Sequence, residues 1–109
     1  MKQGDARSLD DVMTDDFMNS FPHPWLVIED SAHLFETTLA VLRYFDPRLV
    51  AGDYMVVEDG VVSYLSGKRY RQYEGGPNLA IKQFLAANGE RYFIDTELCD
   101  YFGSELSQR

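Results

Sequence analysis

The chain has 109 residues, the size of one domain or of part of one, so two independent domains are excluded. Hydrophobic residues make up 45% of it, including seven Phe, seven Tyr and one Trp, which is enough for a core and excludes a disordered chain. Eighteen acidic and ten basic residues give a net charge of −8. Because this charge repels phosphate groups, we expect no binding to nucleic acid or to an anionic membrane.

The single cysteine, Cys99, excludes an internal disulfide and a cysteine-rich zinc site. Chains without disulfides are typical of the reducing cytoplasm, and residues 1–10 lack the apolar core of a signal peptide. The longest apolar stretches fall far below the about 20 residues that span a bilayer. We therefore expect a cytoplasmic protein without a membrane span, in which any metal is held by oxygen atoms or by histidine.

The first predicted helix covers residues 9–20. Ser8 is a suitable N-cap, acids occupy the first turn, and apolar residues recur at helical spacing (Leu9, Val12, Met13 and Phe17). Pro22 and Pro24 end this helix. Residues 25–28 then have the composition of a buried strand, which ends in the polar run Glu29-Asp30-Ser31.

The remaining elements continue this alternation of strands and helices. A second helical pattern covers residues 32–45, and a second buried strand covers residues 54–57. After a predicted loop at residues 61–76 come a helix over residues 78–87 and a strand over residues 92–94. The order predicts an α/β domain with a largely parallel sheet.

Acidic residues follow two of the predicted strands. Asp30 follows the first strand, with His33 three residues later, and the pair Glu58-Asp59 follows the second. Ligands of open α/β sheets bind at the carboxyl ends of the strands, so these acids are expected to converge there. Three converging carboxylates call for a hard divalent cation such as Mg²⁺, and His33 is then free to act as a general base.

Each of these residues also has a simpler interpretation. Acids after strands are frequently N-caps or solvated loop residues, and Asp30 is in place to cap the helix predicted near residue 32. A lone histidine in a first helical turn is more often a surface residue than a catalytic one, which applies to His33. Spacing alone leaves both alternatives open.

Three segments together carry a resemblance to a known family. They are VIEDSAH at residues 27–33, GDYMVVED at residues 52–59 and GPNLAIKQFL at residues 76–85. This combination resembles the cephalosporin hydroxylase family, which is related to the macrocin and mycinamicin sugar O-methyltransferases. The resemblance covers residues 4–102 and implies a Rossmann-like class I S-adenosylmethionine-dependent methyltransferase fold.

The resemblance implies a role for each of the clustered residues. Asp30, Glu58 and Asp59 match the family's Mg²⁺ ligands, and His33 matches the histidine proposed as the base. The metal would acidify a hydroxyl of a sugar or other natural product, His33 would take its proton, and the alkoxide would attack the sulfonium methyl group.

Fewer residues match the cofactor-binding part of the family's pattern. Gly4-Asp5-Ala6 resembles the segment in which an aspartate accepts a hydrogen bond from the adenine amino group, so Asp5 and Ala6 are the cofactor-binding candidates. Asp5 as an ordinary turn residue before Ser8 is the equal alternative. The eight glycines include no G-x-G, so the loop that approaches the methionine part of the cofactor is missing.

These departures make the chain similar to the C-terminal half of the family's enzymes. We expect it to be partial, with the metal half of the site but not the full cofactor pocket, and inactive or very weak on its own. The alternative is a non-catalytic fragment or an interaction module that pairs through an exposed sheet edge. A homo-oligomer is compatible with either. Iron-dependent hydroxylation is disfavoured because only His33 lies near the acids, whereas such iron sites use two histidines.

Overall fold

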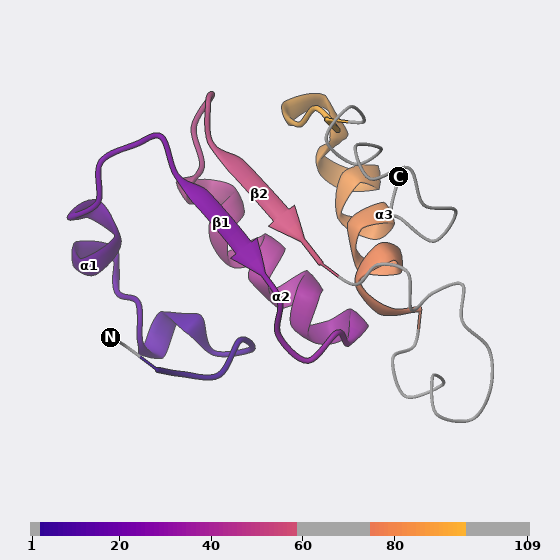
Figure 1. The fold of residues 1–109 in the computed structure, drawn as a ribbon, viewed down its shortest axis with the longest axis horizontal. Helices are drawn as coiled ribbons and strands as arrows, with labels where there is room; N and C mark the ends of the chain where they lie inside the picture. Colours follow the sequence, from indigo (N-terminus) through magenta and orange to yellow (C-terminus); the bar gives the residue numbers. More distant parts are fainter. Residues whose placement is uncertain (1–2, 59–74, 96–109) are drawn as a thin grey trace.

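A computed structural model describes residues 3–58 and 75–95 (Figure 1). Two parallel strands lie against a central helix, with a second long helix beside it and a short helical segment at the amino-terminal side. In chain order the elements are a 3₁₀ turn at Leu9–Asp11, α1 (Asp15–Asn19), β1 (Leu26–Glu29), α2 (Phe35–Phe45), a 3₁₀ turn at Asp46–Arg48, β2 (Tyr54–Val57), α3 (Gly76–Asn88) and a 3₁₀ turn at Gly89–Arg91. The predicted α/β class is confirmed.

The two strands form the predicted strand-helix-strand unit. β1 pairs with β2 in parallel, with Leu26 opposite Tyr54 and Glu29 opposite Val57. Parallel neighbours need a crossover connection, and α2 supplies it. Both strands therefore end at the same edge of the sheet, as predicted.

Helix α2 is the centre of the core. One group of its buried side chains, Val41, Tyr44 and Phe45, packs with Met18 of α1. The other group packs with α3 and consists of Leu39 and Leu42 against Ala80 and Phe84. Met55 of β2 contacts both groups, so helix and sheet share one continuous apolar layer.

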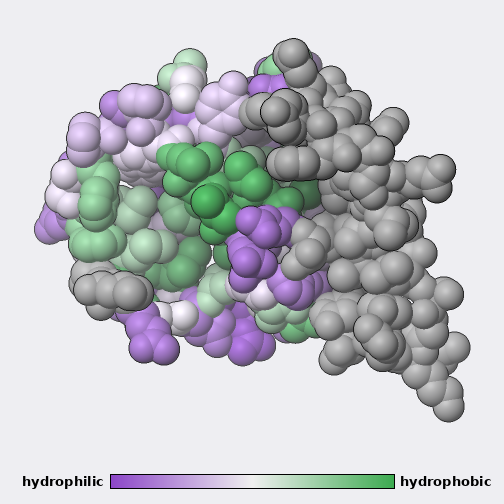
Figure 2. Space-filling view, viewed as in Figure 1, coloured by the Kyte–Doolittle hydropathy of each residue, from purple (hydrophilic) through white to green (hydrophobic). Residues whose placement is uncertain are grey.

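The opposite face of the sheet is exposed, which corrects the prediction of two buried strands. Leu26 and Ile28 of β1 and Tyr54 and Val56 of β2 are all exposed, whereas the residues between them face α2. Figure 2 shows the resulting hydrophobic patch over the two strands. Burial on both faces requires a layer on each side of the sheet, and the described residues supply a layer on one side only.

The predicted helix over residues 9–20 is divided in two. A 3₁₀ turn covers Leu9–Asp11, and α1 begins only at Asp15, where the hydroxyl of Thr14 accepts a hydrogen bond from the Phe17 N–H at 3.3 Å. Ser8 is the N-cap residue of the first turn, but its side chain makes no capping bond. The extended backbone that Thr14 needs as a cap interrupts a continuous helix.

The predicted strand over residues 92–94 is wrong. Tyr92 has extended backbone angles but no ladder partner within residues 3–58 and 75–95, and its hydroxyl donates to Asp46 at 2.5 Å while its ring packs on Phe84. Phe93 is 88% exposed. Tertiary contacts of one side chain thus fix this segment beyond the end of α3, where it forms no strand among the described residues. Helix α3 itself is confirmed, and it extends past the predicted residues 78–87 at both ends.

Candidate functional site

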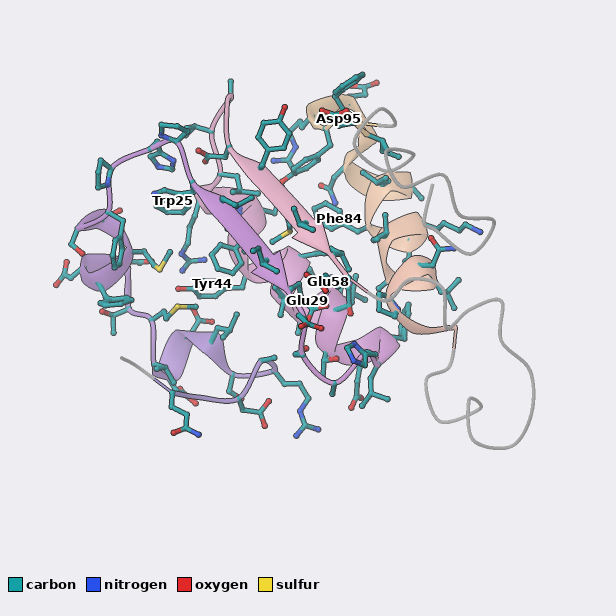
Figure 3. The ribbon with its side chains drawn as sticks, viewed as in Figure 1. Trp25, Glu29, Tyr44, Glu58, Phe84 and Asp95 are labelled. Carbon is teal, nitrogen blue, oxygen red and sulfur yellow. The ribbon has the colours of Figure 1, made fainter. Side chains whose placement is uncertain are left out.

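Glu29 and Glu58 lie side by side at the carboxyl ends of β1 and β2 (Figure 3). The backbone N–H of Glu58 donates to the carbonyl oxygen of Glu29 at 3.0 Å, which continues the parallel ladder past the end of β2. The next step of the same register sets Asp30 beside Glu58. Two of the predicted metal-binding carboxylates therefore come from adjacent strands at one edge of the sheet.

Asp30 and Glu58 are both exposed, and neither carboxylate makes a hydrogen bond or ion pair within the described part of the chain. Mg²⁺ prefers oxygen ligands such as carboxylates, and these two carboxylates have no other partner among the described residues, so their chemistry fits such an ion. The third predicted ligand, Asp59, lies outside the described residues. Within residues 3–58 and 75–95 no group of three or more His, Cys, Asp or Glu side chains is placed to hold a metal.

The interpretation of Asp30 as a helix cap is wrong, and so is the predicted start of the helix at residue 32. Helix α2 begins at Phe35, its N-cap is Leu34, and no side chain caps it. The reason lies at His33, whose φ of 58° is left-handed and cannot belong to a right-handed helix. Asp30 and His33 are thus both loop residues between β1 and α2.

His33 is half-buried in this loop, one residue before the helix cap. A left-handed backbone is uncommon for residues other than glycine, although histidine is enriched among the exceptions. Such conformations cost on the order of 1–3 kcal/mol and persist where the surroundings fix them. The loop therefore holds the backbone of His33 in a defined conformation between β1 and α2.

Asp5, the predicted adenine-binding residue, has its carboxylate engaged by Arg7. The guanidinium of Arg7 bonds both oxygens, at 2.9 and 3.1 Å, and the Arg7 backbone N–H donates to Oδ1 at 2.8 Å. These hydrogen bonds hold the pKa of Asp5 at about 2. The Asp5 carbonyl also accepts from the Ser8 N–H, so the structure describes the turn that the simpler interpretation expects.

Ala6, the second cofactor-side candidate, borders a shallow hollow between the amino-terminal segment and α2. The hollow has a volume of about 230 Å³, below the about 300 Å³ at which ligand pockets usually begin. Three arginines line it: Arg7, Arg43 and Arg48. A hollow of this size, beside an Asp5 already paired with Arg7, does not fit S-adenosylmethionine.

Glu29 is not among the residues predicted from the sequence. It is only 3% exposed, and its carboxyl group accepts hydrogen bonds from the Ser31 N–H at 3.0 Å, the Ser31 hydroxyl, and the Thr38 hydroxyl at 2.9 Å. The strand alternation contains the signal that points to it: Val27 faces α2, so Glu29, two residues later, faces the same way.

Other predicted features fall outside the described residues or carry no chemistry. Cys99 and most of the predicted loop over residues 61–76 are outside. No helix in the described segments is long and apolar enough to cross a bilayer.

Comparison with known proteins identifies the family. A sequence model described as rhamnosyl O-methyltransferase/CmcI matches residues 10–107, nearly the whole chain. No curated protein and no solved structure matches it. The match confirms the family predicted from the residues around Asp30, Glu58 and α3. The chain belongs to the rhamnosyl O-methyltransferase/CmcI family, a family of O-methyltransferases.

Proposed function

We propose that this chain is the metal-binding part of an S-adenosylmethionine- and Mg²⁺-dependent O-methyltransferase, which methylates a hydroxyl group of a sugar or another natural product. The family match supports the reaction class and the small-molecule acceptor. The net charge of −8 disfavours nucleic acid as the acceptor, and the lone cysteine favours the cytoplasm.

One observation carries the metal part of this proposal. The register of β1 and β2, together with the bond from the Glu58 N–H to the Glu29 carbonyl, supports adjacent positions for Asp30 and Glu58 at the carboxyl edge. Two uncompensated carboxylates this close repel one another, and a divalent cation relieves that repulsion. Asp59, the next residue after Glu58, is the proposed third ligand.

The residues at this edge would divide the chemistry between them. Mg²⁺, when bound, lowers the pKa of a hydroxyl group that coordinates it. Asp30 and Glu58 would hold the ion and so fix the acceptor hydroxyl at the sheet edge. His33, held in the loop beside Asp30, would accept the hydroxyl proton as a general base.

The methyl-donor part of the enzyme needs residues that the described chain does not supply. The sequence has no G-x-G loop, the carboxylate of Asp5 is paired with Arg7, and the hollow beside Ala6 is small. Asp5 and Ala6 therefore stay candidates only within a larger cofactor pocket. We expect the chain alone to be inactive or very weak, because residues 3–58 and 75–95 form no complete binding site for the donor.

Metal titration of the whole chain tests the proposal. Mn²⁺, an electron-paramagnetic stand-in for Mg²⁺, is expected to bind the parent, to be displaced by excess Mg²⁺, and to bind Asp30→Asn at least about 10-fold more weakly. Asp16→Asn is the matched control, because Asp16 is an exposed acid on α1, outside the proposed ligand set. Equal Mn²⁺ affinity of the parent and Asp30→Asn would contradict the metal site.

A second candidate function is favoured by the exposed sheet face. Leu26, Ile28, Tyr54 and Val56 form an apolar surface of the kind that marks protein-protein contacts. A non-catalytic interaction module would use this face or the edge of β1 that pairs with no strand in the described part of the chain. Sedimentation of the parent at several concentrations distinguishes the two candidates: a metal-independent dimer that binds no Mn²⁺ favours the module.

A further inference from the structure

We propose that Glu29 is a positioning residue, which fixes the β1–α2 loop and through it the placement of Asp30 and His33. This inference rests on the proposed function, since it assigns Glu29 a task for the proposed ligand and base. Glu29 itself is not a ligand candidate, because it faces α2 and its carboxyl oxygens are already used by Ser31 and Thr38.

The carboxyl group of Glu29 joins three parts of the chain. It belongs to the last residue of β1, it accepts from the backbone and hydroxyl of Ser31 in the loop, and it accepts from the hydroxyl of Thr38 at 2.9 Å in the first turns of α2. Thr38 is fully buried. One side chain therefore ties the two ends of the loop to each other across Asp30 and His33.

Glu29 also connects the loop to the second strand. Its carbonyl oxygen accepts from the N–H of Glu58, so two of the proposed metal-binding residues, Asp30 and Glu58, adjoin Glu29 through a covalent or a hydrogen bond. A displacement of Glu29 would thus change the spacing between these two carboxylates. Figure 3 shows the closeness of Glu29 and Glu58 at this edge.

If only packing mattered at position 29, an apolar residue would destabilise the fold less than a buried carboxyl group does. A buried carboxyl group is costly unless its oxygens are hydrogen-bonded, and replacing buried polar groups by apolar ones of similar shape is often neutral or stabilising. Here the hydrogen bonds go to the loop that must also hold His33 at a φ of 58°. A loop with such a residue persists only where neighbouring contacts fix it, and Glu29 bonds residues on both sides of His33.

Nuclear magnetic resonance of the whole chain provides a readout that needs neither metal nor methyl donor. The three-bond coupling between the His33 amide and α protons reports φ at His33, and the amide shifts of residues 30–33 report the loop. In Glu29→Met we expect the His33 coupling and these shifts to change, and Mn²⁺ affinity to fall by about 10-fold or more. In Glu29→Gln we expect most of the effect to be rescued, because the amide oxygen can accept from Ser31 and the amide N–H can donate to Thr38.

Two further variants complete the test. The double variant Ser31→Ala/Thr38→Val removes both hydroxyl donors with little change in volume, and it is expected to reproduce Glu29→Met; it decides the question if Glu29→Met does not fold. Glu36→Gln is the control. Glu36 is an exposed acid in α2, the helix that holds Thr38, and its only partner among the described residues is Arg7, at 3.5 Å.

The outcomes separate this inference from the proposed function. An unchanged His33 coupling and unchanged loop shifts in both Glu29→Met and the double variant would overturn the positioning role, even if the parent binds Mn²⁺. If the parent binds no Mn²⁺, the proposed metal site is overturned. If the loop shifts change in the Glu29 variants of that same chain, the role of Glu29 in fixing the loop is still supported.

Discussion

The carboxylate of Asp53 accepts a hydrogen bond from Nδ1 of His23 at 2.8 Å and so joins the entry of β1 to the entry of β2. The Asp53 side chain is 1% exposed, and it also accepts from the backbone N–H groups of Trp25 at 2.7 Å and Val50 at 2.8 Å. The His23 ring stacks on Trp25, with centroids 4.1 Å apart. These bonds fix the amino end of the sheet, and with it the register that sets Asp30 beside Glu58 at the other end.

Replacement of Asp53 by alanine is expected to destabilise the fold strongly. The change removes the buried carboxylate that accepts from the N–H groups of Trp25 and Val50 and from His23, and each hydrogen bond to a charged group contributes about 1.5–3 kcal/mol. We expect a decrease of at least about 2 kcal/mol in the free energy of unfolding, measured by urea denaturation. Asp16→Ala, at an exposed position of α1, is expected to change it by less than about 0.5 kcal/mol. A similar effect of the two substitutions would contradict the role of Asp53.

The stability of the chain is expected to fall in acid. Burial raises the pKa of Asp53, but hydrogen bonds from Val50, Trp25 and His23 outweigh burial and bring the pKa below its ordinary value of 3.8. Burial also raises the pKa of Asp46, where bonds from Arg91 and Tyr92 again produce a net decrease. The unfolded chain therefore takes up these protons at a higher pH than the folded chain does.

This contribution to stability is fully present above the unfolded pKa and is lost as the pH falls through the lower folded values. Urea denaturation between pH 7 and pH 3 measures it. In Asp46→Asn we expect a lower stability at pH 7 and a shallower loss in acid than in the parent, because one of the two carboxylates no longer titrates. A loss in acid as steep as the parent's would show that Asp46 does not contribute.

The sequence predicts the strand-helix-strand unit well because its signals are local. Residues 25–28 and 54–57 are short apolar runs next to polar residues, and the helical pattern between them is long, so the parallel pairing and the shared carboxyl edge follow. No pattern in the sequence marks Asp53 as the residue that joins the two strands. Its bonds to His23 and Trp25, 30 and 28 positions away, depend on tertiary structure, which periodicity does not report.

Three errors have the same kind of cause. The apolar run at residues 92–94 has the composition of a strand, but the Tyr92 hydroxyl bonds Asp46 and the run forms no strand among the described residues. The apolar composition of the strands suggested burial on both faces, although burial depends on layers that the described residues do not provide. The left-handed backbone of His33 is a property of a loop that Glu29 fixes through contacts on either side, so helical periodicity placed the start of α2 too early.

At position 33, glycine is expected to give a more stable protein than alanine, because the backbone there is left-handed. Both variants remove the imidazole, but alanine pays the steric cost of a φ of 58°, whereas glycine does not. We expect His33→Gly to be more stable to urea than His33→Ala by about 1 kcal/mol. At Ala86, an exposed position within α3, glycine should instead be less stable than alanine by about 1 kcal/mol. The same order at both positions would contradict the left-handed conformation of His33.

The two faces of the sheet are expected to respond differently to truncation of an apolar side chain. Leu39 is 7% exposed and lies in the core between α2 and α3. Its replacement by alanine is expected to lower the free energy of unfolding by about 2–5 kcal/mol, because the change leaves a cavity among packed neighbours. Ile28 is 57% exposed on the open face of β1. Its replacement by alanine is expected to lower the free energy of unfolding by less than about 1.5 kcal/mol, since water already reaches much of its side chain. Urea denaturation of dilute samples measures both losses. If Ile28→Ala were as destabilising as Leu39→Ala under these conditions, Ile28 would have to be covered in solution, and a concentration-dependent loss would identify a second copy of the chain as the cover.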